Sequence, residues 1–146
     1  MSFDHSSESV EFYTPPAIVE AARAAMGGID LDPASCAEAN EVVQAEDYFT
    51  SEGGGLGYAW VHGPSLDPRP ARVFCNPPGG KVGKRSSAVV WWEKLCAQWC
   101  DENVSQAVFI CFNLEVLNTT QACVFSCLDF PICYFRVRPR FEPDVA

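Results

Sequence analysis

FCNPPGG, residues 74–80, ends an apolar run that begins at Ala71 and has the composition of a buried β-strand. Proline lacks an amide N–H and cannot continue a sheet, while glycine adopts backbone angles that other residues avoid. The strand is therefore predicted to stop here in a turn. Because open α/β sheets bind ligands outside the carboxyl ends of their strands, the same turn is a candidate active-site loop.

Helical and strand-like segments alternate on both sides of this turn. Thr14 is a predicted N-cap, the two prolines after it suit a first helical turn, and Gly27-Gly28 suit a helix end. Segment 105–112 is a nearly continuous apolar run, which is typical of a central parallel strand. The predicted helices cover residues 15–26, 35–45, 88–100 and 115–121, and the predicted strands cover residues 29–32, 47–50, 71–75, 105–112 and 132–135.

This alternation predicts an α/β fold with a doubly wound, mostly parallel sheet. Residues 1–12 are polar and lack a period, so they are predicted to be a flexible lead-in, with residues 13–146 as a single domain. No apolar run approaches the roughly 20 residues of a membrane span. The N-terminus also lacks the basic and apolar regions of a signal peptide, so we expect a cytoplasmic protein with no membrane partner.

The net charge of −9 disfavours indiscriminate binding to a polyanion. It leaves room for a local basic face, however. Such a face has two candidate clusters, of which the first follows the turn and the second lies near the C-terminus: Lys81, Lys84 and Arg85, and Arg136, Arg138 and Arg140. Either cluster alone is also typical of an ordinary solvated surface.

Eight cysteines lie mostly inside apolar runs, and without a secretion signal they are interpreted as reduced, buried thiols. Two pairs, Cys96/Cys100 and Cys123/Cys127, have the i, i+4 spacing of one helical face. Four thiolates from two such faces are an alternative zinc site. Neither histidine lies near either pair and there is no CxxC knuckle, so no metal is predicted.

Polar residues beside proline follow two of the predicted strands, in Asp32-Pro33-Ala34-Ser35 and in Asn76-Pro77-Pro78. In a parallel sheet these strand ends point to the same edge, so both motifs are placed to line one cleft. The amide oxygen of Asn76 and the carbonyl of Pro77 form a pair of acceptors suited to the two N–H groups of an exocyclic amine. Asp32 has an alternative role as a helix cap, and Asp47 as a solvated turn residue.

These residues resemble the phage-type DNA N6-adenine methyltransferases, which use S-adenosylmethionine. Asn76-Pro77-Pro78 match the family's fourth motif, Phe12-Tyr13-Thr14-Pro15 look like its N-terminal cofactor motif, and Asp30 to Ser35 look like its strand-end motif. The resemblance covers about residues 12–141. Further residues fall in the family's order: Asn40, Ala45, Tyr48-Phe49-Thr50, Gly55-Leu56, Trp60, Trp91-Trp92 and Phe112-Asn113-Leu114-Glu115.

The resemblance implies a Rossmann-like methyltransferase domain, minimal or truncated at its C-terminus, that methylates the N6 amine of adenine in DNA. It assigns Asn76, Pro77 and Pro78 to the target amine. It assigns the cofactor to Tyr13, Thr14, Asp32, Pro33, Ala34 and, as a ribose partner, Asp47. Phosphate contacts are expected from Lys81, Lys84 and Arg85. The family commonly protects phage DNA from restriction in the host cytoplasm, and a second copy of the chain is a candidate for completing the short fold.

Three departures from the family's pattern favour an alternative function. Gly79 stands where relatives carry an aromatic residue, glycine precedes Gly55-Leu56 where many relatives carry an acid, and the chain stops at Ala146. They favour a catalytically impaired module of the same fold that binds cofactor, nucleic acid or a protein. An N-methyltransferase acting on a small molecule or a protein is a third interpretation. If the chain does methylate adenine, the aromatic surface that Gly79 lacks is expected from Trp91, Trp92 or Phe112.

Overall fold

A computed structural model of the chain describes residues 12–52, 54–137 and 139–143, and has a mixed α/β fold. Four parallel strands lie in the order β3 (Asp47–Tyr48), β2 (Leu31–Asp32), β5 (Arg69–Cys75) and β8 (Val104–Phe109). The short β4 (Val61–His62) pairs antiparallel with the start of β5. Strand β5, which leads into the turn of the opening motif, therefore has neighbours on both sides.

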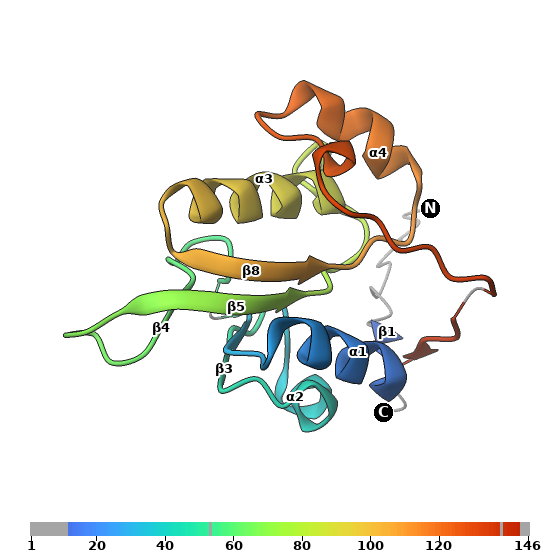
Figure 1. The fold of residues 1–146 in the computed structure, drawn as a ribbon. Coiled ribbons are helices and arrows are strands. Elements are labelled where there is room, and N and C mark those ends of the chain that lie inside the picture. The colour runs from blue at the N-terminus through green and yellow to red at the C-terminus, as the bar shows by residue number, and fades with distance from the viewer. Residues whose placement is uncertain (1–11, 53, 138, 144–146) are drawn as a thin grey trace, which may run out of the picture.

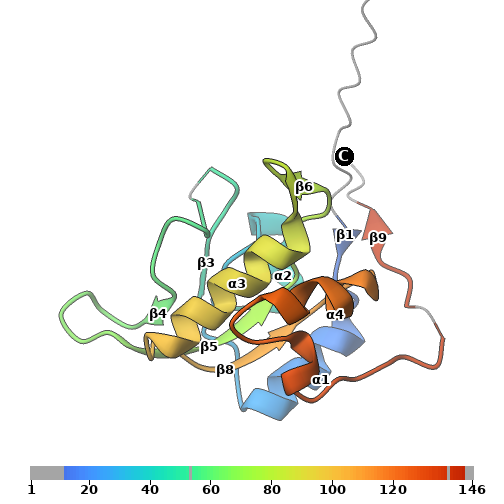
Figure 2. The ribbon, with the colours of Figure 1, turned by 90° about the horizontal axis from the view of Figure 1, so that it is seen from above.

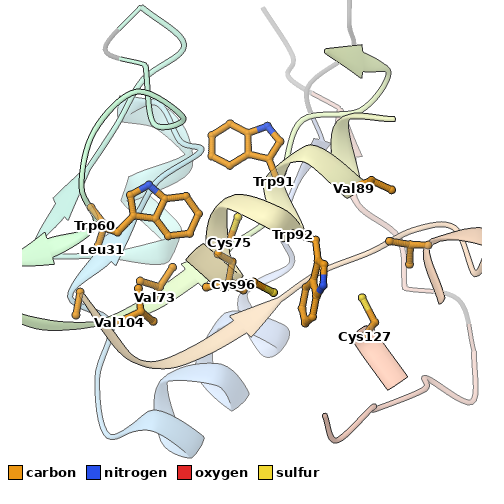
Figure 3. Close-up of a cluster of buried hydrophobic side chains, with 13 residues drawn as sticks. Leu31, Trp60, Val73, Cys75, Val89, Trp91, Trp92, Cys96, Val104 and Cys127 are labelled. Carbon is orange, nitrogen blue, oxygen red and sulfur yellow. The ribbon is translucent and has the colours of Figure 1, made fainter. Parts of the chain in front are cut away.

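Helices cover both faces of this sheet (Figure 1). Helices α1 (Pro16–Met26) and α2 (Ala37–Val43) lie over one face, and α3 (Ser87–Cys100) lies over the other with α4 (Glu115–Thr119) beside it. Alternate residues of β5 point to the two helical layers on opposite faces of the sheet. Phe74 packs with α1 and α2, whereas Val73 and Cys75 pack with α3. Figure 3 shows the α3 layer, in which tryptophan side chains from α3 and from the loop before β4 fill the space above the sheet.

Shorter elements complete the described chain. Strands β6 (Lys81–Val82) and β7 (Arg85–Ser86) form a hairpin between β5 and α3. Strands β1 (Phe12–Tyr13) and β9 (Glu142–Pro143) bring the two ends of the domain together (Figure 2). Two 3₁₀ turns, Thr120–Ala122 and Cys127–Asp129, follow α4. None of the described helices has the length and apolarity to span a membrane.

The predicted alternation of strands and helices is confirmed, but one predicted strand lies at the sheet edge and is shorter than predicted, and another is absent. Segment 105–112 is not a central strand, because β8 ends at Phe109 and pairs only with β5 among the described residues, which leaves Ser105 and Gln106 exposed at a sheet edge. Residues 132–135 form no strand and pair with no described strand, and the next regular element after the second 3₁₀ turn is β9.

Two smaller predictions change as well. The predicted helix 115–121 divides into α4 and a 3₁₀ turn. Of the predicted lead-in, residues 1–11 lie outside the described residues, and Phe12 belongs to β1.

Candidate functional site

A cavity of about 990 Å³ lies at the carboxyl ends of the parallel strands. All four strands contribute to its lining, since Asp32 ends β2, Thr50 follows β3, Asn76 follows β5 and Phe112 follows β8. The cavity brings together eight of the predicted site residues from the two motifs and the N-terminal strand: Tyr13, Thr14, Asp32, Pro33, Ala34, Asn76, Pro77 and Pro78. The two strand-end motifs therefore line one cleft, as the sequence predicts.

Thr14 contacts Asn76 directly within this cavity. The Asn76 side-chain nitrogen Nδ2 donates a hydrogen bond of 3.1 Å to the Thr14 hydroxyl oxygen Oγ1, and Thr14 is only 6% exposed. The N-cap prediction for Thr14 is wrong, because Pro15 occupies the N-cap position of α1 and no side chain caps that helix. With its nitrogen held by Thr14, the Asn76 amide has its oxygen directed away from Thr14. This is a positioning role that local sequence does not reveal.

Asp32 is almost fully buried in the cavity wall, with 3% of its surface exposed. Burial raises the pKa of its carboxyl to about 7, although hydrogen bonds from the Ala34 N–H and from Ser35 act in the opposite direction. The Ala34 N–H lies 3.2 Å from Oδ1. Asp32 does not cap α2, because the N-cap of that helix is Cys36, whose sulfur accepts from the Ala39 N–H. A cationic group bound beside Asp32 would favour its ionised form.

The glycine-rich loop after β3 packs tightly against the Asp32-Pro33 motif. A Cβ atom added to Gly55 would lie 1.9 Å from the Pro33 carbonyl oxygen, so only glycine fits there. The Gly55 carbonyl accepts a 2.7 Å hydrogen bond from Trp60 Nε1, and the Trp60 ring stacks on Trp91 with centroids 6.1 Å apart. Trp91 lines the cavity, and its buried Nε1 has no hydrogen-bond partner among the described residues. Within the described chain, this N–H is therefore a buried, unpaired donor on a residue of the cavity lining.

Asp47 does not line this cavity. Its side chain is exposed, and its Oδ2 lies 3.9 Å from His62 Nδ1. Thr50 and Ser51, which follow the same strand, line the cavity instead. Sequence reasoning missed these two residues because it placed the strand end two residues too late, over 47–50 instead of Asp47–Tyr48.

The predicted phosphate contacts lie on the β6–β7 hairpin, which reaches the cavity through Val82. Lys81 and Lys84 are exposed. Arg85 is engaged by Glu93 of α3 in two hydrogen bonds of 2.6 and 2.7 Å. Of the C-terminal cluster, Arg140 lines the cavity, Arg136 is exposed, and Arg138 lies outside the described residues.

The cysteines divide between the core and the surface. Cys75, Cys96 and Cys127 are buried, as predicted, and burial raises the pKa of Cys96 to about 12, whereas Cys100, Cys111 and Cys133 are exposed. Over the described ranges, the one group of three or more potential metal ligands within 4.8 Å is Asp30, Glu46 and His62. The two cysteine pairs therefore do not form the alternative tetrathiolate site. The Asp30 carboxylate is already bound by Arg72 at 2.8 and 2.9 Å.

Comparison with models of protein families, with curated proteins and with solved structures gave no match to this chain.

Proposed function

We propose that this chain transfers a methyl group from S-adenosylmethionine to the N6 amine of adenine in DNA. One observation carries the proposal: Asp32-Pro33 and Asn76-Pro77-Pro78 follow two adjacent parallel strands and line the same cavity. Either motif alone is an ordinary strand end. Together they bring a buried carboxyl group and a pair of amine acceptors into one cavity.

The arrangement of the sheet supports a doubly wound, Rossmann-like methyltransferase domain. The four parallel strands lie in the order β3-β2-β5-β8, so the strand order reverses between β2 and β5. Ligands of doubly wound sheets bind at such a switch point, and the cavity lies at the ends of these two strands. The helices on both faces agree with the same architecture (Figure 1).

The size and the lining of the cavity support S-adenosylmethionine as the cofactor. Its volume of about 990 Å³ is at the upper end of the range for small-molecule sites. In this proposal Asp32 holds the ammonium group of the methionine part, and Tyr13, Pro33 and Ala34 line the same cavity. Trp91 lies in the same lining and contributes an aromatic wall to it. When bound, the cofactor supplies an electrophilic methyl group on sulfur.

Asn76 and Pro77 hold the nucleophile in the proposed reaction. The hydrogen bond to Thr14 fixes the nitrogen end of the Asn76 amide, so its oxygen and the Pro77 carbonyl accept from the two N–H groups of the adenine amine. Both acceptors favour a pyramidal amine nitrogen with its lone pair aimed at the methyl group. Pre-orientation of this kind is a recognised source of rate acceleration.

Adenine reaches this cavity only after it leaves the base stack, which costs a few kcal/mol. The candidates for phosphate contacts that offset part of this cost are Lys81 and Lys84 on the β6–β7 hairpin and Arg140 in the cavity lining. Arg85 is a weaker candidate than the sequence suggested, because Glu93 already binds it.

Calorimetric titration with S-adenosylmethionine tests the proposal at its first step. Wild-type protein and Asn76→Ala are expected to bind the cofactor with similar affinity, because Asn76 is assigned to the amine. Asp32→Asn is expected to bind at least tenfold more weakly, because an amide does not neutralise the ammonium group. Absence of binding heat at millimolar cofactor would refute the proposal that this chain is a methyltransferase. Cofactor binding without any methyl transfer would favour the non-catalytic module.

A further inference from the structure

The loop that holds the amine carries no aromatic side chain of its own. Gly79 follows Pro78 in the cavity lining, and a Cβ atom built on it meets nothing within 4 Å. An extruded base is normally held by stacking on aromatic or apolar side chains as well as by hydrogen bonds. The space beside Gly79 is open, so the stacking surface has to come from another part of the cavity.

Two phenylalanines from distant segments meet at this cavity. Phe112 follows β8 and Phe141 precedes β9, and both line the cavity together with Asn76 and Gly79. Their ring centroids lie 4.5 Å apart with an interplanar angle of 71°, which is an edge-to-face arrangement. Phe112 is 52% exposed, so a large part of its ring is accessible to a ligand.

The β1–β9 pairing ties Phe141 to the residues that hold the amine. Tyr13 pairs with Glu142, the residue after Phe141, and Thr14 follows Tyr13 directly. Thr14 in turn accepts the hydrogen bond from Asn76. Two consecutive residues therefore connect the groups: Thr14 holds the Asn76 amide, and Tyr13 pairs with the residue after Phe141.

The other aromatic residues of the region are already engaged. Trp91 is 6% exposed and stacks on Trp60. Trp92 lies in the core, where its Nε1 donates to the Phe125 carbonyl at 2.8 Å (Figure 3). Phe74 is fully buried. Tyr13 also lines the cavity, but it is half-buried and its hydroxyl oxygen accepts from the Cys36 sulfur at 3.6 Å. Among the aromatic residues that line the cavity, Phe112 is the most exposed, and Phe141 packs against it.

We propose that Phe112 and Phe141 form the surface on which the extruded adenine stacks, in place of an aromatic residue at Gly79. This inference rests on the proposed function and assigns its base-binding subsite. It makes the C-terminal segment around Phe141 part of the site.

The test compares binding of a (dA)12 oligonucleotide with binding of a 12-residue abasic strand by fluorescence anisotropy. Phe112→Ala is expected to weaken (dA)12 binding about 5- to 100-fold and to leave abasic binding unchanged, because base stacking is removed and the phosphate contacts are kept. Phe135→Ala is the matched control, because Phe135 is 55% exposed and does not line the cavity. Equally weakened binding of both oligonucleotides, or unchanged binding in Phe112→Ala, would overturn the proposal, as would absence of any preference for (dA)12.

A rescue variant separates stacking from a structural role. Gly79→Tyr places a ring in the open space beside the amine, and the added Cβ meets no neighbour. In the Phe112→Ala background it is expected to restore most of the (dA)12 affinity, and failure to do so would contradict a stacking role. Calorimetry with S-adenosylmethionine reports on the proposed function independently. Unchanged cofactor binding with a failed rescue would refute only the proposed stacking surface. Absence of cofactor binding would refute the proposed methyltransferase activity.

Discussion

At the scale of single residues, the hydrogen bond from Asn76 to Thr14 is the contact on which the proposed chemistry depends. It joins the residue after β1 to the loop after β5, and the two residues are 62 positions apart in the chain. A pattern of threonine followed by prolines suits a helix start, and only the tertiary structure shows that Pro15 takes that position and frees the Thr14 hydroxyl for Asn76. Side chains that act across the fold leave no local signal.

Thr14→Val is expected to lower the rate of methyl transfer about 10- to 100-fold, because the methyl group cannot accept from Asn76 and the amide is no longer fixed in orientation. Thr14→Ser keeps the acceptor and is expected to stay within about threefold of wild type. The measurement is kcat with a methylatable DNA, alongside the cofactor Kd. Because Asn76 engages the Thr14 hydroxyl, Thr14 is assigned here to positioning Asn76 instead of to the cofactor, and both variants should leave the cofactor Kd nearly unchanged. Equal kcat values for the valine and serine variants would contradict the positioning role.

Asp32 predicts a pH-dependent stability. Its pKa rises from 3.8 to about 7 on folding, so between these values the native state binds the extra proton. Stability is therefore highest below about pH 4, falls as the pH rises towards 7, and is constant above that for this group. Asp32→Asn cannot titrate, so it does not lose this stability as the pH rises. The unfolding free energy of the variant minus that of wild type should therefore increase by on the order of 4 kcal/mol between pH 4 and pH 8. Urea unfolding of both proteins at the two pH values measures this; a gain that is the same at both would contradict a neutral buried carboxyl.

At the scale of elements, the glycine-rich loop after β3 forms a wall of the cavity because Gly55 lies against Pro33. Gly55→Ala must push the loop away from the Pro33 carbonyl and weaken the hydrogen bond from Trp60. We expect the unfolding free energy to fall by about 1–3 kcal/mol and cofactor binding to weaken.

Gly57→Ala is the control in the same loop, because its added Cβ would approach only the Gly54 carbonyl oxygen, at 3.4 Å. Its urea midpoint and its cofactor Kd should match those of wild type. If the two alanine variants behaved alike, the close packing of Gly55 would not be what shapes the wall.

The elements that the sequence predicts well are those whose own periodicity decides them. The face of α1 that carries Val19, Ala22 and Met26, and the apolar run of β5, are both evident from the chain. The position of a strand within the sheet is not evident from the chain. The apolar run of β8 suits an edge strand that helices partly cover as well as it suits a central strand. Phe141 could not be identified as a site residue either, because only the β1–β9 pairing brings it to Phe112.

At the scale of the whole molecule, the charge of −9 contrasts with the exposed cations close to the cavity. Because the rest of the chain is acidic, phosphate binding is expected to depend on these few cations near the cavity. A double variant, Lys81→Gln with Lys84→Gln, should reduce the slope of log Kd against log salt by about 1.4 for single-stranded DNA, at about 0.7 for each phosphate that is no longer neutralised. Arg69→Gln is the control, because Arg69 begins β5 at the end opposite the cavity. An unchanged slope in the lysine variant would place the phosphate contacts elsewhere.

The most direct measurement is mass spectrometry of nucleosides from unmethylated DNA incubated with the protein and S-adenosylmethionine. Wild-type protein is predicted to produce N6-methyl-2′-deoxyadenosine, and Asn76→Ala at least tenfold less, although that variant still binds the cofactor. Wild-type protein that binds the cofactor but forms no N6-methyladenine, or an Asn76→Ala variant as active as wild type, would contradict the assignment of this cavity to adenine methylation.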